Sequence, residues 1–294
     1  MAGVATDARL SEVAGRLSEL SRQQAYNVYE LFDWPDSLPE DQYWIAPELM
    51  TVHGTPVWEE LTEEERIRLS RWESVNFFSL NVHLIRELIG EVADRIYTTR
   101  FPGLSDFFHD FIHEENEHMW FFATFCRRYG GKLYPTRRLN TEFAGDDGAL
   151  HDLTVFGRIL IAEELCDAFN APMGTDERLP RIVQDINQVH HRDESRHIAF
   201  NRQLMRALAE EAAATSGPDG PARAGDYLAR YITVCLRSLY NPTVYLDAEL
   251  PNARGLRARL LGDVARQEAH RALLSRTMSF LERIGLCTEA DVAW

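Results

Sequence analysis

The stretch Ile186-Asn187-Gln188-Val189-His190-His191-Arg192-Asp193-Glu194-Ser195-Arg196-His197-Ile198-Ala199-Phe200 decides the fold that this sequence predicts. In a helix, with about 100° per residue, His190, Glu194 and His197 lie within roughly 60° of one another. Asp193, Arg192 and Arg196 are expected to point away from that stripe. Imidazole and carboxylate groups suit iron, zinc or manganese. The pattern H-x-x-x-E-x-x-H is much rarer than a lone E-x-x-H, and it indicates a row of metal ligands.

A second E-x-x-H motif, Glu115 to His118, lies on a helix expected at about 104–129. A long helix expected at about 62–99 precedes it, with Phe101-Pro102-Gly103 between the two, which predicts an antiparallel hairpin. Glu115 and His118 share one face of their helix, and the neighbouring acids Glu114 and Glu117 share another.

The distance of Glu115 from the turn of this hairpin indicates which acid on the first helix lies beside it. Glu115 lies about 14 residues, or roughly 21 Å, after the turn, and Glu87 lies equally far before it. Glu87 is therefore the expected ligand from that helix, and Glu91 and Glu73 remain as alternatives.

A third helix, expected at about 149–170, is apolar almost throughout and ends in adjacent acids. Glu163 continues the apolar face of Phe156 and Ile159, so it is preferred as a ligand over Glu164. A polar connection at 132–148 precedes this helix, and a fourth helix at about 178–213 carries the opening motif.

These helices predict an all-α fold in the ferritin-like arrangement. That arrangement takes one Glu from each of two helices and a Glu-x-x-His from each of the other two. Further helices are expected at about 8–32, 222–240 and 252–285. The predicted architecture is a single domain over 1–294, a four-helix bundle at about 62–213 with additional N- and C-terminal helices.

Composition limits the classes of function. The chain has 294 residues, of which 45% are hydrophobic, and a formal net charge of −15, which argues against binding to nucleic acid or to an anionic membrane surface. The sequence contains no long apolar run, its four cysteines are isolated from one another, and its first residues are not expected to form a signal peptide. A cytoplasmic location is the expectation.

With these motifs in place, the chain resembles the AurF-type diiron N-oxygenases, the p-aminobenzoate N-oxygenase family of the ferritin-like superfamily. His190, one turn before Glu194, is the feature that carries the resemblance. The resemblance implies seven iron ligands, with Glu115 and Glu194 as bridging carboxylates: Glu87, Glu115, His118, Glu163, His190, Glu194 and His197.

The resemblance also implies the activity. Two non-haem iron ions would use O2 as co-substrate to oxidise an arylamine to a hydroxylamine, nitroso or nitro product, as in the biosynthesis of nitro groups in secondary metabolism. The expected partners are a small-molecule amine, a reductase or small reductant that supplies electrons, and a second copy of the chain in a homodimer. The alternatives are an oxygenase acting on carbon or on an aliphatic amine, a non-catalytic iron-binding protein, and a helical scaffold. A ribonucleotide reductase-like radical subunit is disfavoured because Phe122 stands where such subunits have a Tyr.

Several other residues have two interpretations at this stage. Arg158 and Arg196 could bind a substrate carboxylate or support the ligands. A tyrosine-rich stripe near the C-terminus could line a cavity but is expected to be core: Tyr227, Tyr231, Val234, Cys235, Leu239, Tyr240 and Tyr245. The aromatic loop around Trp34 and Trp44 is expected to wrap the bundle rather than form a lid. His270 is expected to be exposed, and His83 to support Glu87.

Overall fold

The computed structural model describes residues 8–135, 148–217 and 219–294, and within these ranges all the regular structure is helical. The helices are α1 (Ala8–Gln23), α2 (Pro56–Glu60), α3 (Glu63–Ala93), α4 (Ser105–Tyr129), α5 (Ala149–Met173), α6 (Arg181–Ser216), α7 (Asp219–Leu239), α8 (Pro242–Asp247), α9 (Ala253–Leu261) and α10 (Val264–Arg283), with short 3-10 turns at Pro47–Leu49 and Glu289–Asp291.

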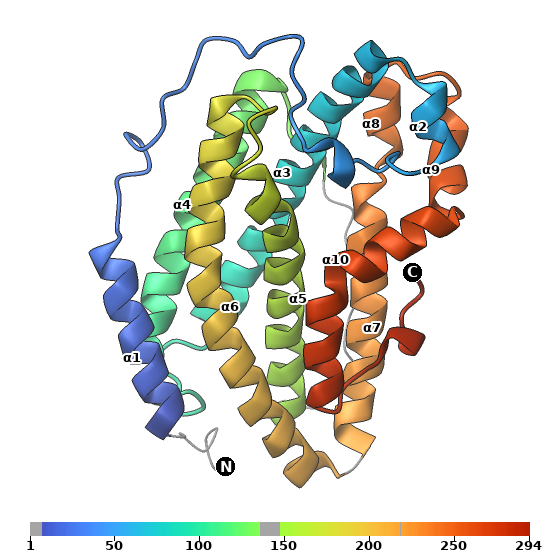
Figure 1. Ribbon diagram of the computed structural model, residues 1–294. Helices are drawn as coiled ribbons and strands as arrows, with labels where there is room; N and C mark the ends of the chain where they lie inside the picture. The colour runs from blue at the N-terminus through green and yellow to red at the C-terminus, as the bar shows by residue number, and fades with distance from the viewer. Residues whose placement is uncertain (1–7, 136–147, 218) are drawn as a thin grey trace.

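Four long helices form the bundle, as Figure 1 shows. Helix α3 packs along α4, and α5 packs along α6, so the bundle consists of two helical pairs. Contacts between α4 and α6 and between α3 and α5 join the pairs. The predicted all-α, ferritin-like four-helix bundle is therefore confirmed.

Helices from the N-terminal and C-terminal parts of the chain pack on the outside of the bundle. Helix α1 packs against α4 and α6, whereas α7 and α10 pack against α5 on the opposite side (Figure 1). None of the described helices combines the length and apolar character that a membrane crossing requires.

The start of α3 follows the sequence closely. Thr62 caps it with a capping box, in which its hydroxyl accepts from the Glu65 amide and the Glu65 carboxylate accepts from the Thr62 amide. The helix ends at Ala93 rather than near residue 99, because Tyr97 adopts a left-handed conformation with φ 57° and its amide donates to Ser105 Oγ.

Two other predicted helices were too long. Helix α1 ends at Gln23 instead of residue 32, and turns follow it. The helix expected at 252–285 is two helices, because Asp263 leaves the helical conformation and its side chain accepts from the Ala265 amide to begin α10. The polar connection predicted at 132–148 lies mostly outside the described residues.

The aromatic loop wraps the bundle, as the sequence indicates. Trp34 stacks on Tyr129 with ring centroids 6.3 Å apart, and Trp44 contacts Phe125 edge-on at 5.7 Å. Both partner rings lie on α4, so these aromatic contacts hold the loop against the outside of this helix.

Candidate metal centre

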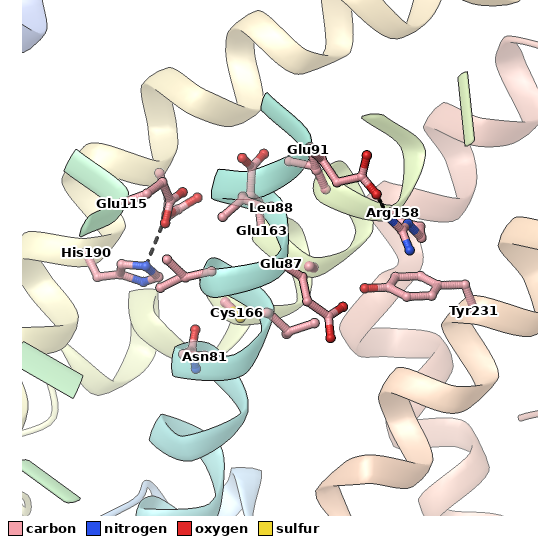
Figure 2. A pocket seen from close by; sticks show the side chains of 15 residues that line it. Asn81, Glu87, Leu88, Glu91, Glu115, Arg158, Glu163, Cys166, His190 and Tyr231 are labelled. Atoms are coloured by element: carbon pink, nitrogen blue, oxygen red, sulfur yellow. Dashed lines mark hydrogen bonds and ion pairs between the residues drawn. The ribbon is translucent and has the colours of Figure 1, made fainter. Parts of the chain in front are cut away.

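Six buried side chains from α4, α5 and α6 converge inside the bundle. They form two overlapping groups in which the potential ligand atoms all lie within 4.8 Å of one another. One group is His118, His190 and Glu194, and the other is Glu115, Glu163, Glu194 and His197. Figure 2 shows Glu115, Glu163 and His190 from these groups around the pocket.

Helical spacing explains the convergence. Glu115 and His118 are one turn apart on α4, Glu194 and His197 are one turn apart on α6, and His190 lies one turn earlier on α6. Because α4 and α6 are in contact, the two motifs face each other across the bundle.

The two motif carboxylates lie between the imidazoles. Glu194 Oε1 is 3.1 Å from His190 Nε2, 3.5 Å from His197 Nδ1 and 3.6 Å from His118 Nδ1. Glu115 presents Oε1 to His197 Nδ1 at 3.2 Å and Oε2 to His118 Nδ1 at 3.4 Å. Glu115 and Glu194 would thus be shared between the imidazole groups of both motifs, which suits them to hold two metal ions.

The potential ligand atoms form no hydrogen bonds, although the imidazole nitrogens lie 3.1–3.6 Å from the glutamate oxygens. His118 Nδ1, His190 Nε2 and His197 Nδ1 are buried without a hydrogen bond, and so is one oxygen on each of the three glutamates. Such orphaned polar atoms are costly unless something binds them. Their chemistry, imidazole nitrogen and carboxylate oxygen, fits a pair of transition-metal ions.

Electrostatics also call for a cation. Burial raises the pKa of the Glu163 carboxyl well above its usual value, and the nearby charge of Glu194 raises it further. Burial opposes ionisation of Glu115 and Glu194 as well, but the neighbouring histidines outweigh it and lower the pKa of both. Glu163 is therefore the carboxyl with the least compensating charge, and a metal ion would supply it.

Acidic residues just before each motif hold the opposite helix's histidine. His118 Nε2 lies 3.3 Å from Asp193 Oδ2 on α6, and His197 Nε2 lies 2.9 Å from Glu114 Oε2 on α4. Each carboxylate therefore accepts from Nε2–H and leaves Nδ1 free for a metal. The pKa of Asp193 is lowered strongly: burial opposes ionisation, but the His118 hydrogen bond and charge outweigh it.

Asp193, Arg196 and Glu114 lie outside both groups of potential ligands, as expected, but they contact the histidines or one another on the outer side of the centre. Arg196 Nη2 donates to both Asp193 and Glu114, so one guanidinium joins the two outer acids, and its Nε donates to Ser21 on α1. These contacts account for Arg196 without a substrate. A sequence signal was available, since an acid precedes both glutamates in the repeated pattern [DE]-E-x-x-H.

The third imidazole has a neutral partner. The Asn170 side-chain nitrogen Nδ2 contacts His190 Nδ1, and Asn170 Oδ1 has no hydrogen-bond partner. With the amide turned so that its oxygen accepts from Nδ1–H, the Nε2 lone pair of His190 is free to bind a metal. Nothing in the sequence spacing singled out Asn170.

The structure does not bring Glu87 into either group of potential ligands. Its side chain is exposed and lines the pocket, and Figure 2 shows its carboxylate directed toward Tyr231, away from Glu115 and His190. Within the described residues α3 supplies no member of either group, because Asn81, Ile85 and Leu88 occupy its buried positions beside the pocket.

The alternatives to the predicted acids have other partners. Glu91 pairs with Arg158 at 2.7 Å and with Arg95 at 3.2 Å. Glu73 accepts from the Thr51 amide at 3.1 Å. Glu164, the alternative to Glu163, accepts from Arg202 at 2.6 Å and from Thr277 at 2.5 Å.

One cavity adjoins the centre, and a second shares lining residues with the first. A small one of about 40 Å³ is lined by Glu115, Glu163, His190 and Glu194 together with residues of α3 and α7. A larger one of about 350 Å³ lies between α3, α5 and α7. Both are lined by Asn81, Leu84, Glu87 and Cys166, which therefore lie at the boundary between them.

The C-terminal aromatic stripe divides between cavity and core. Tyr231 lines the small cavity, and Val234, Cys235, Leu239 and Tyr240 line the large one. Tyr227 and Tyr245 are also buried but line neither.

Two histidines differ from expectation. His270 is buried rather than exposed, and its Nε2 lies 2.7 Å from Tyr240 Oη. His83 lines the large cavity, where its Nε2 contacts the Tyr134 carbonyl at 2.8 Å instead of supporting Glu87.

Comparison with known proteins identifies the family of this chain. The model of the family described as p-aminobenzoate N-oxygenase AurF matches residues 7–285. The chain belongs to the AurF family. The recognition made from His190 and the two E-x-x-H motifs is thus confirmed.

Among individual relatives, uncharacterised proteins of Mycobacterium bovis and Mycobacterium tuberculosis are 26% identical over 216 residues. These matches cover 69% of this AurF-family chain and 62% of the relatives, so the chain spans less than two thirds of their length. An R2-like ligand-binding oxidase variant with an aerobically reconstituted Mn/Fe cofactor superposes with a TM-score of 0.49 at 14% identity, covering 95% of this chain and 93% of its own.

Proposed function

We propose that this AurF-family protein is a non-haem diiron oxygenase that uses O2 to oxidise the nitrogen of an arylamine to a hydroxylamine, nitroso or nitro product. The observation that carries the proposal is the set of six buried ligand atoms without hydrogen-bond partners, three imidazole nitrogens and three carboxylate oxygens. The ligands proposed are Glu115, His118, Glu163, His190, Glu194 and His197.

The iron pair would supply the redox chemistry that activates O2. In the first oxidation of the amine, one oxygen atom is inserted into an N–H bond and the other leaves as water. That step consumes two electrons and two protons, so an external reductase or small reductant is part of the proposal.

The chain's own residues prepare the centre. Asp193 and Glu114 fix the tautomers of His118 and His197, and Arg196 holds both acids in place. Apolar side chains such as Leu88 and Ile159 line the small cavity and limit the water beside the ligands.

Metal analysis and product analysis test the proposal together. The protein loaded with ferrous iron, supplied with a chemical reductant and O2, is incubated with a panel of arylamines, and products are analysed by mass. We expect two irons per chain and products that contain one or two additional oxygen atoms, with two hydrogens lost as well in the nitroso and nitro products. Two irons without any oxidised amine would contradict N-oxygenation, and oxygen found on carbon would favour the alternative of a carbon oxygenase.

A matched pair of histidine variants provides the control. His190→Ala should lower iron content and arylamine oxidation by at least about tenfold, because a buried ligand is lost. His191→Ala, at the adjacent half-exposed position, should retain both. Full activity and unchanged iron content in His190→Ala would contradict the ligand assignment.

A further inference from the structure

We propose that Glu87 binds the amino group of the substrate at the boundary of the two cavities, and that the substrate is an amine whose apolar body occupies the larger cavity. This inference rests on the proposed function, because it assigns the substrate class of the same centre. It also gives Glu87 a role in binding substrate in place of the predicted role in binding iron.

The direction of approach follows from where the ligand groups come from. The six side chains lie on α4, α5 and α6, and in the described part of the chain α3 adds none. On the side that faces α3 the centre therefore borders the small cavity instead of a further ligand group, and there the cavity lies against Asn81, Ile85 and Leu88. A substrate can reach the centre from this side without displacing a ligand.

Glu87 stands where the linings of the two cavities meet. It lines both of them, together with Asn81, Leu84 and Cys166. Figure 2 shows its carboxylate on the α7 side of the small cavity, directed toward Tyr231 rather than toward Glu115. A molecule that extends from the large cavity to the centre would pass this carboxylate.

The Glu87 carboxylate is available to a ligand. Within the described residues it has no hydrogen bond or ion pair, whereas Glu91, one turn later, is paired with Arg158 and Arg95. A carboxylate only accepts hydrogen bonds, so its complement is an N–H donor, charged or neutral. An amine satisfies this requirement, and an ether does not.

The lining of the large cavity suits a ligand with an apolar body. Glu87 lies at the end next to the centre, while Arg237 and Arg257 line the wall formed beyond Tyr231 along α7 and α9. Between them the lining includes Phe77, Leu80 and Leu165. This arrangement favours an amino group at the metal end and an apolar body beyond it.

Calorimetric titration of the iron-loaded protein without reductant tests the inference, because no turnover occurs. The probes are 4-butylaniline and 4-butylanisole, which share an apolar body but differ in having N–H donors or an ether oxygen. We expect the wild-type protein to bind the aniline about tenfold more tightly than the ether, since hydrogen bonds to charged groups have this effect. Equal affinities in the wild type would overturn the proposal.

Variants then assign the preference to Glu87. Glu87→Leu should lose the preference for the aniline while keeping two irons per chain and wild-type affinity for the ether, and Glu87→Gln should retain part of it. Glu64→Leu, at an exposed position of the same helix, is the matched control and should behave as wild type. An unchanged preference in Glu87→Leu would overturn the inference, and so would loss of iron, which would make Glu87 a ligand.

The two proposals fail in different ways. If the wild type oxidises no amine but shows a Glu87-dependent preference for the aniline, the oxygenase function is wrong and the amine site stands. If amines are oxidised and Glu87→Leu leaves both KM and aniline affinity unchanged, the function stands and the amine site is wrong. Iron content and ether affinity report in each variant that the chain has folded.

Discussion

At the scale of single residues, the crossed pairs around the centre are its most informative feature. The acid on α6, Asp193, holds the histidine on α4, and the acid on α4, Glu114, holds the histidine on α6. Each of these two helices thus supplies the acid that orients the histidine ligand of the other. Loss of one pair should loosen a ligand without removing it.

The first prediction concerns Asp193. Asp193→Asn keeps the size of the side chain but removes the charge that stabilises the His118 tautomer. Iron affinity should fall about 10–100-fold, as for other partners of metal ligands, with little change in helix content. Competition with a chelator measures the affinity, and Asp185→Asn at a surface pair with Arg181 is the control. Equal affinity in the Asp193 and Asp185 variants would mean that the crossed pair does not support the centre.

At the scale of elements, the docking of α7 decides whether the large cavity exists. Helix α7 forms one wall of that cavity, and it packs against α5 and the segment after α10 without space to spare. A β-carbon at Gly225 on α7 would approach the Leu286 carbonyl oxygen to 1.9 Å, which is far inside contact distance. Since the obstacle is backbone, it cannot rotate away.

Substitution at this glycine should therefore separate α7 from its neighbours. We expect Gly225→Ala to lower the free energy of unfolding by about 1–3 kcal/mol through overpacking. Gly255→Ala on α9, where a β-carbon would meet nothing within 4 Å, should instead raise it by about 0.5–1 kcal/mol. Chemical denaturation measures both. A Gly225 variant as stable as the Gly255 variant would show that α7 has room to shift.

At the scale of the whole molecule, buried ionisable groups outside the centre make stability depend on pH. Burial raises the pKa of Glu73 to about 7, although hydrogen bonds from Thr51 lower it. Burial, together with Arg266, lowers the pKa of His270 to about 4. The neutral forms of both groups are favoured by folding, so Glu73 stabilises the fold most at low pH and His270 at high pH.

Glu73→Gln isolates one of these contributions. The folded pKa of Glu73 lies above its unfolded value, so its contribution is fully present below about pH 4.5 and is lost as pH rises through about 7. The stability of the variant relative to wild type should therefore improve by about 2–3 kcal/mol between pH 4.5 and pH 8. Unfolding free energies across this range test it, with Glu64→Gln as a control expected to be flat. Parallel curves for wild type and Glu73→Gln would contradict the raised pKa.

The two E-x-x-H motifs and His190 could be predicted from the sequence as metal ligands because their arrangement depends on spacing within single helices. Residues three and four apart lie on one helical face whatever the rest of the chain does. The family and the four-helix bundle followed from this, and helix starts with strong local signals, such as the capping box at Thr62, were predicted to within one residue.

Glu87 shows where local reasoning stops. Depth along the hairpin places it level with Glu115, but the rotation of α3 about its own axis is set by packing, which turns Leu88 inward and leaves Glu87 exposed. His270 is a second example. Its polar sequence neighbours predict an exposed side chain, but packing buries it in contact with Tyr240.

Spacing along single helices was enough to predict the four long helices, their pairing and six of the seven proposed metal ligands, because residues three and four apart share one helical face. Only the tertiary structure decided which acids converge, which acids hold the histidines and where the cavities lie. Those features depend on how separate helices rotate and pack against one another, and no single helix encodes that.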